Sequence, residues 1–376
     1  MQILDFFIGN RFVNFLCLAM IFIVILWNVS SLKSYATKKG TGYFLLWLSV
    51  ALYSVFYSPV HDDNYASLES YYAYSSGIEE TYLHFEPIYF RIMDIIPYGY
   101  AVWRFFIWGI GALILTLYIK WMRFDINVST VILLYFALPL LNYQRAIIGY
   151  LLLYIALSLL VKLIDENGNL VKKTRQLMIA SVCIMAALPF HNSMPFYVFI
   201  MLISFFLPAN RNTLGFCLLG CLVLSVTDMG SLFLSYTSEE TQRTAEYYLE
   251  DAKLGNSANF FGLIEQLCMY GPYYTMLAFC AWNINSVKLC FTRYEKTVLT
   301  NAVLLILVSL AYSTTSSVVQ GKFYMASLLP WALFLVSFYT RDRKNIVAVT
   351  YAKWTLYAFI GSSIIKILSG SIVNLI

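Results

Sequence analysis

Long apolar runs alternate with short polar segments along the whole chain, and most runs are near the roughly 20 residues that a membrane-crossing helix needs. Several runs are shorter, so some helices are expected to kink or to end below the membrane surface. The pattern predicts an all-α fold, a polytopic integral membrane helix bundle with about 12 transmembrane helices in a single domain, residues 1–376. The expected helices cover 12–31, 43–59, 99–119, 127–142, 146–163, 176–190, 194–208, 212–230, 263–284, 297–313, 323–340 and 350–373.

Composition agrees with this pattern. Of the 376 residues, 60% are hydrophobic and only 12% are charged, whereas about a quarter of a soluble domain is charged. No stretch resembles a nucleic-acid-binding patch, so no nucleic acid is expected as a partner. The opening stretch MQILDFFIGN lacks the basic region and the cleavage site of a signal peptide, so the first apolar run is expected to be kept as a spanning helix.

The seven cysteines do not predict a metal site or a disulfide framework. Nearly all of them lie within apolar runs or at their inner ends. Cys217 and Cys221 are one helical turn apart, but no histidine or carboxylate stands near them in the sequence to complete a ligand set. We interpret the cysteines as small core residues, and we expect neither a metal nor a cofactor.

Basic residues are unevenly distributed between the two sets of loops. One set holds 17 of the 25 lysines and arginines, and the positive-inside rule therefore makes that side cytoplasmic. Both termini are then outside. The outer side holds the three histidines, most of the acids and the two longest connections, residues 58–98 and 231–262. Residues 58–98 are dense in tyrosine, and the middle of the second connection, residues 238–252, is expected to form a helix at the membrane interface. Tyrosine favours that interface and also offers flat faces on which sugar rings stack.

Four cations on the expected outer side are candidates for binding a diphosphate. Arg145 follows Asn142, Tyr143 and Gln144 in a tight outward hairpin. An arginine at membrane depth costs about 2.5–3.5 kcal/mol on insertion scales, so it requires a partner: lipid headgroups if it snorkels, or a phosphate that its guanidinium grips with two hydrogen bonds. The other three are Arg104, Arg243 and Lys322.

Four titratable side chains on the same side are candidates for acid–base chemistry. His191 lies in a second outward hairpin, within LPFHNSMPF, where Pro189 is expected to end one helix and Asn192 and Ser193 to cap the next. Asp62 and Asp63 begin the first outer connection, and Glu86 precedes Pro87 where that connection re-enters apolar sequence. Alternatively, the acids only form a solvent-exposed surface, and His191 is only a hydrogen-bonded residue at the end of a helix.

Four short motifs in order resemble those of the EpsG family of exopolysaccharide proteins, which is related to Wzy-type oligosaccharide polymerases. They are HDDNYASLESYY, EPIYF, QRAIIGYLLL and FHNS, and together they extend over residues 60–195, about a third of the chain. The weaker segments RTAEYY and GKFYM extend the resemblance toward the C-terminus. The family is expected to prefer arginine where this chain has Lys322, which lacks the two-pronged guanidinium.

The resemblance implies a membrane glycosyltransferase, a polysaccharide polymerase. Its substrates would be oligosaccharide repeat units on undecaprenyl diphosphate, and its products exopolysaccharide, capsule or O-antigen. It would be a multi-pass protein of the bacterial cytoplasmic (inner) membrane, with its active site facing the periplasm or exterior. Its partners would be membrane lipids, a flippase and a chain-length regulator. Such chemistry requires positive charge for the departing diphosphate and a base for the acceptor hydroxyl.

Two other classes of protein also fit a cationic outer cavity. A transporter or flippase for a lipid-linked glycan or an anionic solute would use the same charges, but internal repeats and gate charges on both sides are not visible in the sequence. A membrane acyltransferase with His191 as its base would need a histidine on the cytoplasmic side if its donor were acyl-CoA, and the expected topology places none there.

Overall fold

The computed structural model describes the chain in segments, and every element within the described residues is a helix. The described residues are 3–8, 10, 12–17, 19–20, 23, 52, 55–56, 63–77, 87–124, 144–165, 169–191, 193–207, 209–226, 273–275, 277–287, 289–311 and 317–341. The contacts divide the chain into two compact units, Met1–Met201 and Leu202–Ile376, and each is described by itself. The expected single domain over 1–376 stays a prediction.

The described part of the chain contains four helices long and apolar enough to cross a membrane. They are Tyr100–Met122, Ala146–Asp165, Arg293–Ala311 and Gly321–Phe338. The expectation of an all-helical membrane protein is therefore confirmed. The total of about 12 spans and the outer location of both termini stay predictions, and the expected helices at 43–59, 127–142 and 350–373 lie largely or wholly outside the described residues.

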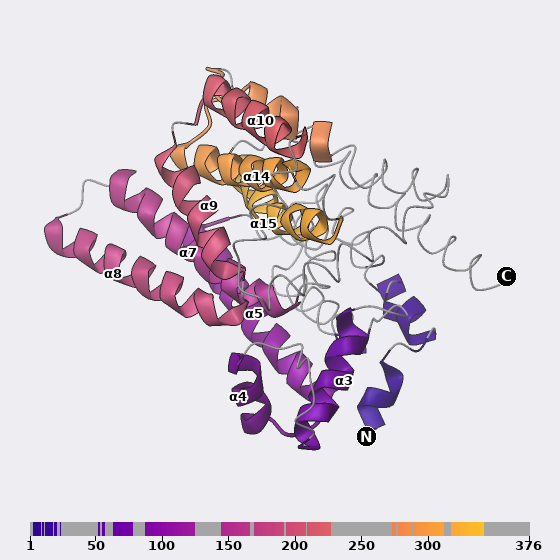
Figure 1. Ribbon diagram of the computed structural model, residues 1–376. Helices are drawn as coiled ribbons and strands as arrows, with labels where there is room; N and C mark the ends of the chain where they lie inside the picture. The colour runs from indigo at the N-terminus through magenta and orange to yellow at the C-terminus, as the bar shows by residue number, and fades with distance from the viewer. Residues whose placement is uncertain are drawn as a thin grey trace. The chain divides into compact units, whose positions relative to one another are not determined.

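In its described residues, the first unit contains a short 3-10 helix and five α-helices before the turn that holds His191. Figure 1 shows α7 and α8 side by side. In chain order the elements are η1 (Ile3–Phe7), α3 (Asp63–Ser75), α4 (Pro87–Ile95), α5 (Tyr100–Met122), α7 (Gln144–Asp165), α8 (Leu170–Ala187) and η3 (Leu188–Phe190), and α9 (Met194–Phe206) then leads into the second unit. The outer connection 58–98, expected only as a tyrosine-rich segment, thus contains two helices.

Helices α5 and α7 run in the same direction. This is expected for two spans that both begin on the predicted outer side and are connected by one span of opposite direction. Gly111, in the middle of α5, faces Ile147 and Ile148 near the start of α7. Further along, the Tyr118 hydroxyl lies 2.7 Å from Oγ of Ser158. At the basic ends, the Lys162 ammonium lies 3.9 Å from the centre of the Trp121 ring, which is a cation–π contact.

Helices α7 and α8 are antiparallel and pack through small and branched residues. Ala156, Leu159 and Ala180 form a buried cluster between them, and small residues allow the two backbones to approach closely. Asn169 caps the start of α8 because its side chain accepts a 3.0 Å hydrogen bond from the Lys172 amide. The Asn169 cap therefore fixes where the second helix begins.

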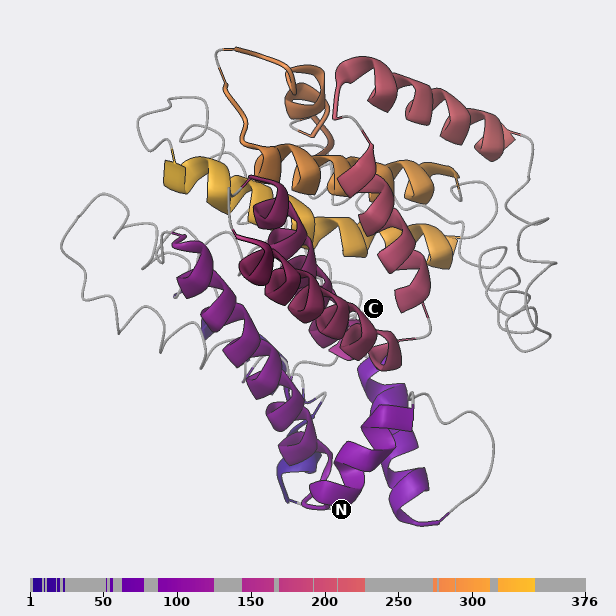
Figure 2. The ribbon, with the colours of Figure 1, turned by 90° about the vertical axis from the view of Figure 1, so that its left-hand side faces the viewer.

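The second unit contains α10 (Arg211–Val226), α14 (Arg293–Ala311) and α15 (Ser317–Arg341). Figures 1 and 2 both show α14 and α15 side by side. Aromatic side chains of α15 at helical spacing, Trp331, Phe334 and Phe338, stack along the helix, and Phe291 packs edge-on against Phe334 and Phe338 with ring centres 5.3 Å away. These contacts fix the two helices against each other.

Candidate functional site

The turn around His191 has the form that the sequence predicts. Helix α8 ends at Ala187, a 3-10 turn containing Pro189 follows, and His191 is extended with φ −163° and ψ 140°. Helix α9 begins at Met194, so Pro195 lies in its first turn, where a missing N–H costs little. The short polar interruption therefore connects two apolar helices and leaves His191 half-buried at their junction.

Hydrogen bonds within this turn determine which imidazole nitrogen carries the proton. The Ser193 amide donates a 3.1 Å bond to Nδ1 of His191, and the Ser193 hydroxyl lies 2.6 Å from the same nitrogen. Because a backbone N–H can only donate, Nδ1 must accept, and the neutral ring carries its proton on Nε2. The geometry therefore makes His191 a donor through Nε2. Ser193 stands directly before α9, where a cap was predicted, and its hydroxyl also contacts the imidazole; Asn192 lies outside the described residues.

Helix α7 supports this turn through a close approach at Gly149. A Cβ added there would lie 2.8 Å from Sδ of Met194 and 3.2 Å from the carbonyl oxygen of Ala187. Only glycine fits without displacing the turn. Arg145 lies one helical turn before Gly149, so the structure brings its backbone to the same end of α7 as the His191 turn; its side chain lies outside the described residues.

We expect Gly149→Val to destabilise this end of the first unit by about 1–3 kcal/mol, because the added atoms overpack the turn. The matched control is Gly109→Ala in α5, where an added Cβ meets nothing within 4 Å; it should be neutral or stabilising by up to about 1 kcal/mol through helix propensity. Thermal unfolding in detergent, followed by circular dichroism, measures both variants. Equal midpoints for the two variants would contradict the close approach.

An aromatic cluster extends from α3 and α4 to the residue before His191. Its members are Tyr71 of α3, Tyr89 of α4, Tyr100 and Trp103 of α5, and Phe190 of η3. Tyr71, Tyr89 and Tyr100 each lie 5.7–6.0 Å from Trp103 between ring centres, and Tyr89 lies 6.2 Å from Phe190. These distances are typical of interacting rings. The cluster therefore connects α3, α4 and α5 to the His191 turn.

Arg104 contributes a buried positive charge to this aromatic cluster. Its side chain is 2% exposed, Nη1 donates a 3.0 Å hydrogen bond to the Tyr100 hydroxyl, and the guanidinium carbon lies 5.7 Å from the Tyr100 ring centre. Arginine keeps its charge at any ordinary pH. The buried guanidinium therefore contacts Tyr100, and its binding of a diphosphate stays a prediction.

A buried aspartate that the sequence analysis missed anchors α5. Asp5 accepts hydrogen bonds from the amides of Tyr100 and Ala101, at 3.3 and 2.8 Å, and from the Tyr72 hydroxyl. A carboxylate at the start of a helix satisfies N–H groups that have no partner within the helix, and it complements the helix dipole. Gly99, with φ 108°, makes the turn into α5, and its amide donates to the Tyr71 hydroxyl. An acid inside the apolar stretch ILDFF was the available signal.

Tyr74 and Asp94 connect α3 and α4. The Tyr74 hydroxyl donates to the two carboxylate oxygens at 3.0 and 3.2 Å. This hydrogen bond to Asp94 raises the pKa of Tyr74 above its usual value and keeps the hydroxyl protonated as a donor. Helices α3 and α4 are thus held together by polar contacts as well as by ring contacts.

The remaining predicted residues are placed only in part. Asp63 is the first residue of α3, with its side chain outside the described residues, and Lys322 is half-buried near the start of α15 in the second unit. Asp62, Glu86 and Arg243 lie outside the described residues, as does the outer connection 231–262. The structure thus joins Arg104 to the His191 turn through the aromatic cluster and brings the Arg145 backbone to that turn.

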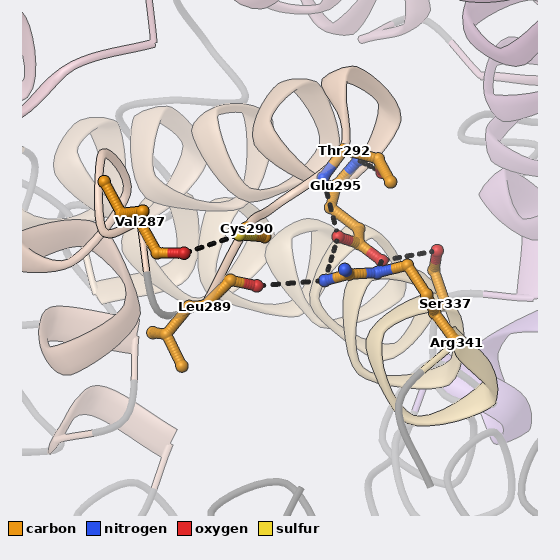
Figure 3. Close-up of polar contacts among 7 residues, drawn as sticks. All are labelled: Val287, Leu289, Cys290, Thr292, Glu295, Ser337 and Arg341. Carbon is orange, nitrogen blue, oxygen red and sulfur yellow. Dashed lines mark hydrogen bonds and ion pairs between the residues drawn. The ribbon is translucent and has the colours of Figure 1, made fainter.

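A second polar cluster that the sequence analysis missed fixes the start of α14 to the end of α15, as Figure 3 shows. Glu295 is fully buried. Its carboxylate accepts from the Thr292 amide, Ser337 Oγ and Arg341 Nε, and Arg341 Nη2 lies 3.1 Å from Oε2. The Thr292 hydroxyl accepts from the Glu295 amide in return, which completes a capping box. The sequence signal was TRYE before an apolar run.

No protein-family model, curated protein sequence or solved structure matches this chain.

Proposed function

We propose that this chain is a membrane glycosyltransferase that polymerises oligosaccharide repeat units carried on a lipid diphosphate, undecaprenyl diphosphate being the expected carrier. The observation that carries the proposal is the aromatic cluster, which contains the buried cation Arg104 and continues to the His191 turn. The buried rings hold α3, α4 and α5 against the turn, a fixed positive charge favours a diphosphate, and an imidazole supplies a hydrogen-bond donor. The chain combines these properties at one end of the first unit.

The reaction would transfer a glycosyl group from the lipid diphosphate to an acceptor hydroxyl. The bond between the anomeric carbon and the diphosphate oxygen breaks, the acceptor oxygen bonds to the same carbon, and the hydroxyl proton passes to a base. Negative charge grows on the departing diphosphate, so fixed positive charge stabilises the transition state most. Arg104 would supply this charge through its field and Arg145 by direct contact, with Arg243 and Lys322 as the further proposed ligands.

The hydrogen bonding of His191 favours a division of roles between imidazole and carboxylate. With Nδ1 accepting from Ser193, the neutral ring offers Nε2–H to a sugar or phosphate oxygen. The base for the acceptor hydroxyl would then be a carboxylate, for which Asp62, Asp63 and Glu86 are the candidates on the proposed outer side. We propose that this side faces the periplasm or exterior of a bacterial cytoplasmic membrane, where a flippase would supply the substrate and a chain-length regulator would limit the product.

Purified protein in nanodiscs, incubated with lipid-diphosphate-linked repeat units, should produce a ladder of polymers. Arg145→Ala should slow the reaction by roughly 100-fold or more, as loss of a transition-state charge partner does. Arg145→Lys should retain only part of the wild-type rate, because lysine cannot make the planar two-point contact with phosphate. The matched control is Arg91→Ala, an exposed arginine of α4, which should leave the ladder unchanged.

Two results would contradict this proposal. Movement of unaltered lipid-linked glycan across vesicles, with no ladder under any condition, would favour a transporter. A wild-type ladder from Arg145→Ala at normal protein abundance would leave Arg145 as a snorkelling residue. In cells lacking the protein, the polymerase proposal expects single repeat units to be made without being joined.

A further inference from the structure

A polar concavity of about 750 Å³ lies in the second unit, where the start of α10 meets the segment that precedes α14. Amide, hydroxyl and guanidinium groups form most of its lining, together with two aromatic rings. The lining residues are Asn210, Arg211, Asn212, Thr213, Phe216, Trp282, Asn283, Asn285 and Ser286. One lining side chain is cationic and none is acidic, so the concavity favours an anion.

Arg211 is positioned to grip an anion with the edge of its guanidinium. Its central carbon lies 4.5 Å from the centre of the Trp282 ring. Stacking uses the face of the guanidinium and leaves its N–H groups to donate in the plane. Among the described residues, no carboxylate lies within ion-pair distance of Arg211. A planar array of donors without an acidic partner matches the geometry of a phosphate group.

Two asparagines in the lining are already fixed by hydrogen bonds. The Asn210 side chain accepts from the Thr213 amide at 2.8 Å and from the Thr213 hydroxyl at 3.0 Å, which caps α10. The Asn283 side-chain amide donates to the Phe279 carbonyl at 2.9 Å. The wall around Arg211 is therefore held in place before any ligand binds, which lowers the entropy lost on binding.

An apolar, exposed face of α10 begins at the rim of this concavity. Phe216 is 75% exposed, and Leu219, Leu222 and Val223 continue the same face along the helix, each at least half exposed. Trp282, at the rim, is 67% exposed, as is typical of tryptophan at a membrane interface. In a membrane-spanning chain this face meets lipid tails. The site is thus complementary to an amphiphile, whose polar head would lie in the concavity and whose apolar tail would lie along α10.

We propose that this concavity binds the phosphate headgroup of an anionic membrane lipid, with Arg211 as the phosphate ligand and the exposed face of α10 against the acyl chains. The charge distribution along the chain predicts that Arg211 is on the cytoplasmic side, where anionic lipids attract basic pockets between helices. The site is separate from the proposed outer glycosyl-transfer site, and it does not depend on that function.

Native mass spectrometry of the full chain in neutral detergent tests this proposal. Phosphatidylglycerol, phosphatidylcholine and inorganic phosphate serve as separate probes. The protein should bind phosphatidylglycerol in preference to phosphatidylcholine, and Arg211→Ala should weaken that binding by about tenfold, as loss of a charge-assisted hydrogen bond does. Asn285→Asp, which adds negative charge at the exposed rim, should weaken it similarly, and Arg211→Lys by less. The matched control Arg175→Ala, at an exposed arginine of α8, should bind as the wild type does.

Each contrary result overturns a specific part of the proposal. Equal binding of both lipids, or a wild-type affinity in both Arg211→Ala and Asn285→Asp, would exclude this headgroup site. Binding of inorganic phosphate as tight as that of phosphatidylglycerol, with the same dependence on Arg211, would exclude the role of the acyl chains. Unchanged thermal midpoints in the variants separate lost binding from lost folding, and the repeat-unit ladder should be unaffected by Arg211→Ala.

Discussion

Replacing Arg341 with alanine should destabilise the second unit by about 3 kcal/mol, which is the scale measured when one partner of a buried ion pair is removed. The reason is the difference in burial between the partners: Glu295 is fully buried, whereas the Arg341 side chain is 33% exposed. Without Arg341, a buried carboxylate keeps only neutral donors, Thr292 and Ser337. Thermal or denaturant unfolding in detergent measures the loss.

The matched variant is Glu295→Gln, which removes the buried charge and keeps a side chain of similar shape. It should lower the free energy of unfolding by less than Arg341→Ala does, because the arginine left without a partner can still be hydrated. The double variant should be more stable than Arg341→Ala alone, since it contains no unpaired buried carboxylate. A wild-type midpoint in Arg341→Ala would mean that this pair contributes no more than a surface ion pair.

Replacing His191 with alanine should slow polymer formation by roughly 100-fold or more, the effect of losing a hydrogen-bond donor aimed at a reacting group. His191→Gln should retain part of the activity, because its amide can donate where Nε2–H does, and it should remove any pH dependence that arises from the imidazole. Ser193→Ala removes the hydroxyl 2.6 Å from Nδ1 and should have a smaller effect. Ladder assays across pH, at matched protein abundance, measure these variants.

Different results for these variants distinguish the possible roles of His191. A His191→Gln rate equal to the wild type would exclude the imidazole as a base and leave a donor role. Loss of activity in His191→Gln equal to that in His191→Ala would favour proton transfer by the ring. A wild-type rate in His191→Ala would return His191 to a structural role at the end of a helix.

The apolar pattern predicted those elements whose position depends on burial in lipid. Helices α5, α7, α9, α14 and α15 all overlap an expected span, because a long apolar run has few alternatives to a helix in a membrane. Helices α7 and α15 extend beyond the expected bounds at both ends, whereas α9 and α14 end before the expected ends. Helices α3 and α4 were missed because their tyrosine-rich sequence has no apolar run of spanning length.

The contacts that fix the polar clusters could not be predicted, because they join residues far apart in the chain. Glu295 and Arg341 are 46 positions apart, and Asp5 and Ala101 are 96 apart. Hydropathy gives the order of helices but not which ends meet. Local signals were present for both acids: a T-x-x-E capping box before α14 and a lone acid in an apolar stretch near the start of the chain. Which residues each acid contacts depends on how the helices pack in the folded chain.

The position of Asp5 has a consequence for biogenesis. The ribosome makes this aspartate early, but the amides that it caps at the start of α5 follow about 95 residues later. Until then the carboxylate must remain hydrated, since a buried charge without partners is costly. Docking of the first segment onto α5 is therefore complete only after the residues between them have been synthesised. Closing so long a loop adds little entropy cost relative to a loop half its length, so such late docking is thermodynamically inexpensive.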